Sequence, residues 1–212
     1  MSTDFGPAMI KEMVAGRLGT MFRLPVPPVT VVNVPSELIS DSSFPEIADL
    51  GSGPAFASQY VEYAQEFSSI NSPRVSQALR MRTFLFDLWI QNEDRILVNG
   101  AGNPNLLWKA QDEAMHVIDH TSAFDLHFDK RRFVTSHVFR EDHVLLLGQN
   151  VRSEMTQAMQ EFMQNLTQIW DSLPEEWTDP DIPLDPEFVL DETTVRNILL
   201  RFETDDFWDF SQ

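Results

Sequence analysis

Cysteine is absent from the 212 residues, and basic residues are scarce. Without cysteine, the chain has no disulfide framework and no thiolate metal site. The 15 Lys and Arg stand against 33 Asp and Glu, a formal net charge of −18, which argues against nucleic acid and anionic membrane surfaces as partners. No apolar run reaches the length of a membrane span, and residues 1–5 lack the basic and apolar regions of a signal peptide. We therefore expect a soluble, cytoplasmic protein.

Apolar residues are numerous enough to form a core. They make up 42% of the chain and include 16 Phe and 5 Trp, so the core should be rich in aromatic rings. At this length we expect one domain, or one unit of two lobes. The elements expected in the N-terminal half are a helix over 8–23, a strand over 29–34, a loop-rich stretch over 35–58 and a buried helix over 73–91.

The C-terminal half is predicted to be mainly helical. The elements expected there are a helix or a strand over 138–147, a long helix over 151–173, a Pro- and acid-rich loop over 174–186 and a final helix over 191–203. Asp191 or Thr193 would cap the final helix. The acidic and aromatic end of the chain, residues 203–212, either docks onto a partner or folds back onto the core.

The segment that follows the buried helix carries the most chemistry. Asp94 comes just after a nearly all-apolar helical run over 83–90. A hairpin is predicted next, with strands over 106–108 and 115–118 and a polar loop over 110–114. Pairing Leu106 with Ile118 would put Asn105 and Asp119 side by side at the open end. One amide oxygen and one carboxylate suit Mg²⁺, which takes few protein oxygens and fills its other positions with water and phosphate.

Each of these residues also has an ordinary interpretation. Residues 92–95 could be a polar loop with a surface ion pair, and Asp119 could be a turn former. Taken together, the order of carboxylate, amide and carboxylate favours a site for phosphoryl transfer, as in protein-kinase-like enzymes. In that order Asp94 is a base, because a carboxylate held by a rigid helix next to two metal ligands suits the acceptance of a hydroxyl proton.

Several short stretches carry a resemblance to a known family. They are residues 11–19, 24–34, 53–58, 92–95, 105–107 and 118–120. Over roughly residues 8–125 the chain resembles the HipA-like kinase family, bacterial Ser/Thr kinases often found in toxin–antitoxin contexts. The resemblance implies a protein-kinase-like fold and the use of ATP and Mg²⁺.

The resemblance also implies roles for single residues. Asp94 would be the catalytic base, Asn105 and Asp119 the Mg²⁺ ligands, and Glu12 the helix glutamate that pairs with an ATP-anchoring lysine. The other residues that the resemblance places at the nucleotide site are Asn92, Arg95 and His120. An insert over 96–102 leaves Asn103 and Asn105 as alternative metal ligands. The remaining histidines outside this region, His127, His137 and His143, have no metal-binding spacing and are expected to be structural.

The chain departs from the family at the phosphate-binding end. Such kinases carry a glycine-rich loop and a lysine-bearing strand ahead of the helix that holds Glu12. Here eleven residues precede Glu12, with one glycine and no strand pattern. The chain has three lysines. Lys11 is adjacent to Glu12 on the same helix and faces another way, Lys109 is expected at the far end of the hairpin, and Lys130 lies in a basic cluster.

We therefore predict an α+β, protein-kinase-like fold. Residues 1–60 would form a reduced N-terminal lobe of helix plus strand, and residues 61–212 a helical C-terminal lobe with a hairpin over 105–119. The predicted function is ATP- and Mg²⁺-dependent phosphorylation of a protein Ser or Thr, with a partner chain completing the nucleotide site. The alternative is a catalytically inactive pseudokinase that acts as a protein-binding module.

Overall fold

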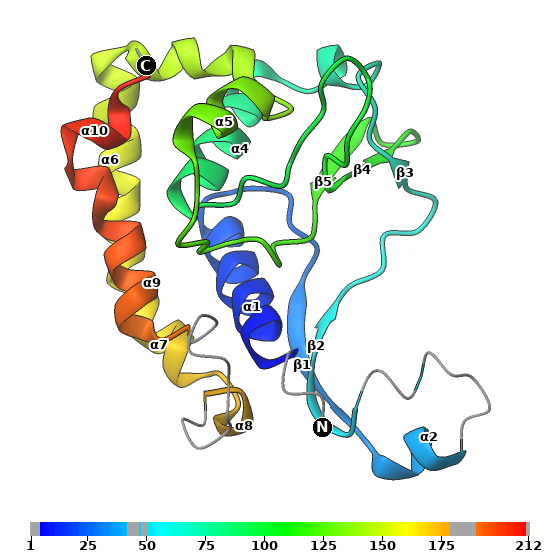
Figure 1. The fold of residues 1–212 in the computed structure, drawn as a ribbon. Coiled ribbons are helices and arrows are strands. Elements are labelled where there is room, and N and C mark those ends of the chain that lie inside the picture. Colours follow the sequence, from blue (N-terminus) through cyan, green and yellow to red (C-terminus); the bar gives the residue numbers. More distant parts are fainter. Residues whose placement is uncertain (1–4, 42–46, 48–50, 179–189, 211–212) are drawn as a thin grey trace.

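The structure, a computed structural model, describes residues 5–41, 47, 51–178 and 190–210 and combines helices with small antiparallel sheets (Figure 1). The α-helices are α1 (Phe5–Met21), α2 (Ser36–Asp41), α4 (Gln77–Trp89), α5 (Lys130–Ser136), α6 (Gln149–Met163), α7 (Leu166–Asp171), α8 (Glu175–Thr178), α9 (Glu192–Leu199) and α10 (Asp205–Trp208). The 3-10 helices are η1 (Ser72–Arg74), η2 (Arg140–Leu147) and η4 (Leu200–Glu203). The strands are β1 (Val29–Val34), β2 (Gly53–Ser58), β3 (Gln65–Glu66), β4 (Leu106–Lys109) and β5 (Ala114–Val117). This mixture confirms the α+β class.

The strands form two separate antiparallel sheets. β1 pairs with β2 along its full length, while β4 lies between β3 and β5 in the second sheet. β1 has the predicted bounds, but β2 and α2 lie in the stretch 35–58 that was predicted to be loop, and that prediction is wrong for them. Within that stretch, residues 42–46 and 48–50 lie outside the described part of the chain. The Gly, Pro and Ala of β2 have weak strand propensity, so its pairing with β1 decides its structure.

Helix α1 packs against the β1–β2 sheet, as Figure 1 shows. Met13, Val14 and Leu18 are completely buried on this helix. A Cβ atom on Gly16 would lie 3.1 Å from the side chain of Val29 in β1, so the glycine permits the close approach of helix and strand. The helix predicted over 8–23 is thus confirmed, with its ends shifted toward the N-terminus.

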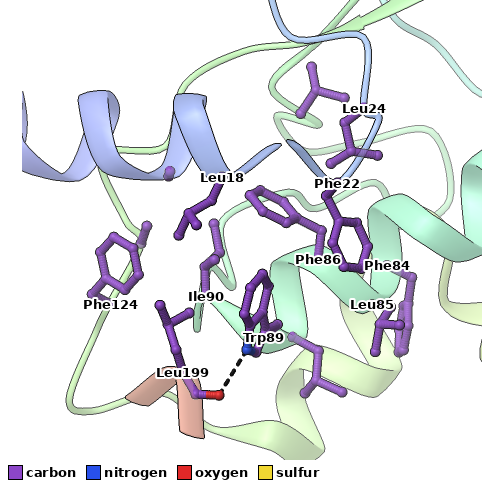
Figure 2. Packing of buried hydrophobic residues seen from close by; sticks show 14 of the residues in the cluster. Leu18, Phe22, Leu24, Phe84, Leu85, Phe86, Trp89, Ile90, Phe124 and Leu199 are labelled. Carbon is purple, nitrogen blue, oxygen red and sulfur yellow. Dashed lines mark hydrogen bonds between the residues drawn. The ribbon is translucent and has the colours of Figure 1, made fainter. Parts of the chain in front are cut away.

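The C-terminal half of helix α4 is buried, and residues from the end of the chain bind to it. Residues 83–90 are all completely buried. The Trp89 indole donates a hydrogen bond of 2.8 Å to the Leu199 carbonyl, shown in Figure 2. Arg201 donates to the carbonyls of Leu88 and Trp89 at 2.9 and 3.2 Å. The two Arg201 bonds satisfy terminal carbonyls of α4, so the helix offers a rigid start to the loop that follows.

The long helix predicted over 151–173 is wrong as a single element. The structure has α6, a break and then α7. At the break the Asn165 side chain donates to the Glu161 carbonyl at 3.1 Å, and such side-chain hydrogen bonds compete with the regular helix. The loop predicted over 174–186 begins with the short helix α8, and its residues 179–186 lie outside the described part of the chain.

The last elements pack on the core. The segment that could have been helix or strand is the 3-10 helix η2. The Asp191 carboxylate caps α9 by accepting a 2.7 Å hydrogen bond from the Thr194 backbone, so Asp191 and not Thr193 is the cap of the two residues considered. The final helix continues as η4. Phe207 and Trp208 of α10 are buried. Up to residue 210 the acidic and aromatic end therefore folds back onto the core, one of the two alternatives considered.

One cluster of buried apolar side chains runs from Ile10 in α1 to Trp208 in α10. Its centre is aromatic, as expected: the ring of Phe22 lies 5.6 Å from Phe86 and 5.7 Å from Trp89 (Figure 2). The division into two lobes at residue 60 stays a prediction. Within the described ranges, no helix is both long and apolar enough to cross a membrane.

Candidate functional site

The loop after α4 brings Asp94 to Asn105. The backbone turns back at Gln91, whose φ is +53°, and the Asn92 backbone donates to the Asp87 carbonyl at 2.8 Å. The Asn105 amide nitrogen Nδ2 then donates to Oδ2 of Asp94 at 3.1 Å. The predicted base and one predicted metal ligand are therefore in direct contact.

The insert between Asp94 and the asparagines is a tight hairpin of its own. The backbones of Val98 and Ala101 exchange two hydrogen bonds of 2.9 and 3.0 Å, and Ile96 donates to the Asn103 carbonyl at 3.1 Å. The side-chain oxygen of Asn103 accepts a 3.1 Å bond from the Asn105 backbone. The insert therefore closes on itself without separating Asn105 from Asp94. Of the two asparagines, Asn103 has its oxygen engaged in the local turn.

The predicted register of the second hairpin is wrong by one residue. Leu106 pairs with Val117 and not with Ile118. The observed register places four buried side chains on one face, namely Leu106, Trp108, Met115 and Val117. Because a one-residue slip moves every side chain to the opposite face, this shared burial decides the register. Asn105 consequently lies opposite Ile118, which donates to its carbonyl at 3.2 Å, and Asp119 follows one residue further along.

Asp119 lies in a turn at the end of β5. Its φ is +57°, and its Oδ1 accepts hydrogen bonds from the Thr121 backbone at 3.3 Å and hydroxyl at 2.7 Å. Among the described residues no group donates to the other oxygen, Oδ2, or to the side-chain oxygen Oδ1 of Asn105. One carboxylate and one amide oxygen of this kind are hard donors that fit Mg²⁺.

Arg95 is completely buried beneath these loops. Its Nε and Nη2 donate to the Asp87 carboxylate at 2.7 and 3.3 Å. Its Nη1 donates to the carbonyls of Pro104 at 3.2 Å and Ile118 at 3.1 Å, and also to the carbonyl of Asn105. Because the Arg95 side chain is 0% exposed, any contribution of Arg95 to a bound nucleotide is indirect.

Asp87 was not among the predicted site residues, yet it organises this buried cluster. Asn92, fully buried, donates to it at 3.0 Å. The Phe139 backbone donates to Nδ1 of His137 at 3.0 Å, so the proton of this imidazole lies on Nε2, which donates to Asp87 at 3.0 Å. Burial raises the pKa of Asp87, but the charge of Arg95 and the bond from His137 outweigh burial and hold that pKa well below its usual range.

A sequence signal for Asp87 did exist. It is the one acidic residue inside the apolar run of α4, and a buried carboxylate needs a charged or hydrogen-bonding partner. The identity of the partners could not be inferred, because Arg95 follows in a loop and His137 lies 50 residues later.

Glu12, predicted to pair with a lysine, contacts a histidine. Its Oε2 lies 3.3 Å from Nδ1 of His120, and the Nε2 of that buried imidazole has no hydrogen-bond partner among the described groups. The three lysines are elsewhere. Lys109 pairs with Asp112 at 2.7 Å, Lys130 donates to a carbonyl of α10, and burial lowers the pKa of Lys11 despite the nearby charge of Asp125.

A pocket of about 390 Å³ lies between the β1–β2 sheet and the β4–β5 hairpin. Its apolar walls include Val29, Phe56, Leu107 and Val117. Glu12, Asp119 and His120 line its polar side. A pocket with apolar walls and a few polar groups is typical of small-molecule sites. The carboxylate of Asp119 lines the pocket, and no lysine or arginine does.

Comparison with known proteins supplies the family. A search of the curated proteins found no match. The model of the family described as HipA-like kinase matches residues 6–211, which extends the resemblance from the motifs to nearly the whole chain. It includes the elements that carry Asp94, Asn105 and Asp119 as well as the buried Arg95 cluster. The chain belongs to the HipA-like kinase family.

Proposed function

We propose that this protein transfers a phosphoryl group from ATP, with Mg²⁺, to a Ser or Thr hydroxyl of another protein. The observation that carries the proposal is the hydrogen bond between the Asn105 amide and the Asp94 carboxylate. It joins the residue types that a kinase uses as base and metal ligand, in a loop that begins at a rigid buried helix.

Asp94, Asn105 and Asp119 would each have a separate role in the transfer. Asp94 has one carboxylate oxygen, Oδ1, without a hydrogen-bond partner among the described residues, and this oxygen can accept the proton of an incoming hydroxyl. Asn105 orients the carboxylate through its amide nitrogen and keeps its own oxygen for the metal. Asp119 offers its free oxygen beside the pocket. Bound MgATP would supply the phosphoryl group and the charge that stabilises its transfer.

A partner chain would complete the nucleotide site. Glu12 contacts His120, and none of the three lysines contacts Glu12 in the structure. The pocket therefore offers no cation of its own to the ATP phosphates. Such electrostatic clamps typically change rates by orders of magnitude, so we infer weak activity of this chain alone and stronger activity once a partner provides a basic strand or loop.

The same contact supports a second candidate function. A catalytically inactive kinase would also lack a lysine in this pocket, and its glutamate would be free to pair with a histidine. In that case the protein is a pseudokinase that binds another protein. The two candidates separate on phosphotransfer, which the pseudokinase lacks under every condition.

Calorimetric titration with ATP tests whether the chain binds the nucleotide and the metal that the proposal requires. We expect the chain to bind ATP only in the presence of Mg²⁺, and we expect Asp119→Ala to remove that binding. Asp112→Ala is the matched control, because Asp112 is an exposed carboxylate at the far end of the same hairpin, paired with Lys109. Equal binding by wild type and Asp119→Ala contradicts the assigned metal site. No binding by the wild type leaves the partner-completed site and the pseudokinase, and rules out a kinase that acts alone.

A further inference from the structure

Arg95 contacts both segments that carry the predicted metal ligands. Its Nη1 donates to the carbonyl of Asn105 itself and to the carbonyl of Ile118, the residue directly before Asp119, the latter at 3.1 Å. We propose that Arg95 is a positioning residue that clamps these two segments together and so sets the relative position of Asn105 and Asp119. The inference deepens the proposed function and rests on it for the metal, while the clamp itself is a property of the folded chain.

The guanidinium is held from its opposite side. Asp87 accepts from its Nε and Nη2, and Asp87 is in turn fixed by His137 and Asn92 at 3.0 Å each. A guanidinium presents five N–H donors in a rigid plane. One edge of Arg95 is thus fixed to helix α4 through Asp87, and the other edge reaches the two segments. A lysine has one nitrogen and cannot make both sets of contacts.

The two segments need such support because their backbones are in an unfavourable conformation. Asn105 has a φ of +48° and Asp119 a φ of +57°, in the left-handed region, which Asn and Asp adopt more readily than other non-glycine residues but still at a cost in free energy. Such conformations persist only where the surroundings hold them. The hydrogen bond from the Ile118 backbone to the Asn105 carbonyl links the segments directly. The carbonyl contacts of Arg95 supply a second, charge-assisted link at the same place.

Full burial determines how Arg95 can act. Its side chain is 0% exposed, so it does not touch a substrate in the pocket and works through the residues that it holds. Residues that orient metal ligands in this way typically change metal affinity by about 10- to 100-fold when they are altered. Arg95 should therefore influence metal binding although it is not itself a ligand.

Arg80 in helix α4 offers a control with similar contacts. Arg80 donates to both oxygens of Asp142 at 2.8 and 3.0 Å, and also to the carbonyls of Ser72 and Val75 at 3.2 and 2.8 Å. Arg80, in helix α4, thus also binds one carboxylate and backbone carbonyls, in a place without any predicted site residue. Arg95→Lys and Arg80→Lys make the same chemical change in these two settings.

Two measurements on the full chain separate the clamping of the two segments by Arg95 from its effect on metal binding. Native-state amide hydrogen exchange without ligand reports the clamp at the Ile118 amide, which bonds to Asn105. We expect this amide to exchange faster in Arg95→Lys than in wild type or in Arg80→Lys. Calorimetry with MgATP reports the consequence. We expect the dissociation constant to rise about tenfold or more in Arg95→Lys and to stay unchanged in Arg80→Lys, although both variants lose stability.

If Arg95→Lys does not fold, Asp87→Asn combined with Arg95→Gln removes both buried charges and avoids leaving one unpaired. The same two measurements then apply to the double variant. Unchanged exchange at Ile118 overturns the clamp, whatever the ligand data show. Faster exchange with unchanged MgATP affinity overturns the positioning role. A wild type that binds no MgATP overturns the proposed function of the isolated chain and the metal-positioning role with it, while the exchange result still decides the clamp.

Discussion

Glu12 in helix α1 lies 3.3 Å from His120, in the turn that follows Asp119. The contact joins the N-terminal helix to the end of the β4–β5 hairpin across 108 residues of sequence. Both side chains line the pocket between the two sheets. The contact gives Glu12 a partner within the folded chain, and its pairing with an ATP-anchoring lysine stays a prediction.

We expect Glu12→Ala to lower the free energy of unfolding by about 1 kcal/mol, since it removes one mostly buried hydrogen bond. The MgATP affinity of the isolated chain should fall less than in Asp119→Ala, because Glu12 lines the pocket but pairs with no lysine. Urea denaturation and calorimetry measure the two quantities. Glu154→Ala, at an exposed position of α6, is the control for removing a glutamate from a helix. A large loss of MgATP affinity would show that Glu12 serves the phosphates directly.

Asp94→Asn should abolish phosphotransfer without lowering stability. An amide oxygen can still accept the hydrogen bond from Asn105, but an amide cannot accept a proton from a hydroxyl. The expected loss of rate is on the order of 10²- to 10⁴-fold. The control is Glu93→Gln, which changes the preceding residue, a carboxylate that pairs with Arg132 at 3.3 Å. A change in stability together with full retention of transfer would assign Asp94 a structural role only.

Two glycines of the insert should respond differently to alanine. Gly102 has a φ of +123°, and a Cβ there would lie 2.5 Å from the Ile96 carbonyl oxygen. Gly100 has a φ of +79° with no atom within 4 Å of such a Cβ. We expect Gly100→Ala to cost about 1 kcal/mol of stability and Gly102→Ala about 3 kcal/mol.

The Gly102 variant should also weaken MgATP binding, because its clash shifts the Ile96–Asn103 contact that precedes Asn105. Chemical denaturation and calorimetry on the two variants provide the comparison. Equal losses of stability for both would argue that the Ile96 carbonyl moves aside without difficulty.

Stability should decline below neutral pH because of His137. Burial lowers the pKa of this imidazole against the opposing effect of Asp87, and Arg95 and Arg140 add to the lowering. The unfolded chain takes up a proton on His137 near pH 6.5, whereas the folded chain takes it up only at lower pH. The unfolded state then binds more protons, so the free energy of unfolding falls as pH decreases below about 6.5, by at most about 1.4 kcal/mol per pH unit.

Urea denaturation between pH 7.5 and 5, roughly one unit to either side of that value, tests this dependence. His137→Gln keeps a donor for Asp87 and should flatten the slope. His116→Gln is measured alongside, because burial and Lys109 lower the pKa of His116 as well. Slopes that are equal in wild type and His137→Gln would show that another group causes the loss.

Much of the helical framework could be predicted from the sequence. Strand β1 has the expected bounds because its Val-Thr-Val-Val-Asn-Val run favours an extended chain. Helices α1 and α4 followed from their apolar patterns, and the Asp191 cap from a local rule about helix starts. Strand β2 was missed because its strand conformation depends on a partner that is not adjacent in sequence.

For the candidate site, too, some features could be predicted from the sequence and others could not. The order of Asp94, Asn105 and Asp119 was visible in the sequence and led to the family that the comparison shows. Their roles stay predictions, although the structure places Asp94 and Asn105 in contact. The pairing of the hairpin was wrong by one residue because a register depends on which face is buried. The local sequence did not reveal which face of the β4–β5 hairpin packs against the core.

The sequence by itself determined the family, helices α1 and α4, strand β1 and the order of Asp94, Asn105 and Asp119, because these depend on patterns within a few neighbouring positions. Only the tertiary structure decided the hairpin register, the pairing of Glu12 with His120, and the buried cluster of Asp87, Arg95 and His137. Each of these joins residues that are distant in sequence through burial. A buried charge takes the partners that the folded chain brings within reach, and that geometry exists only after the elements have packed.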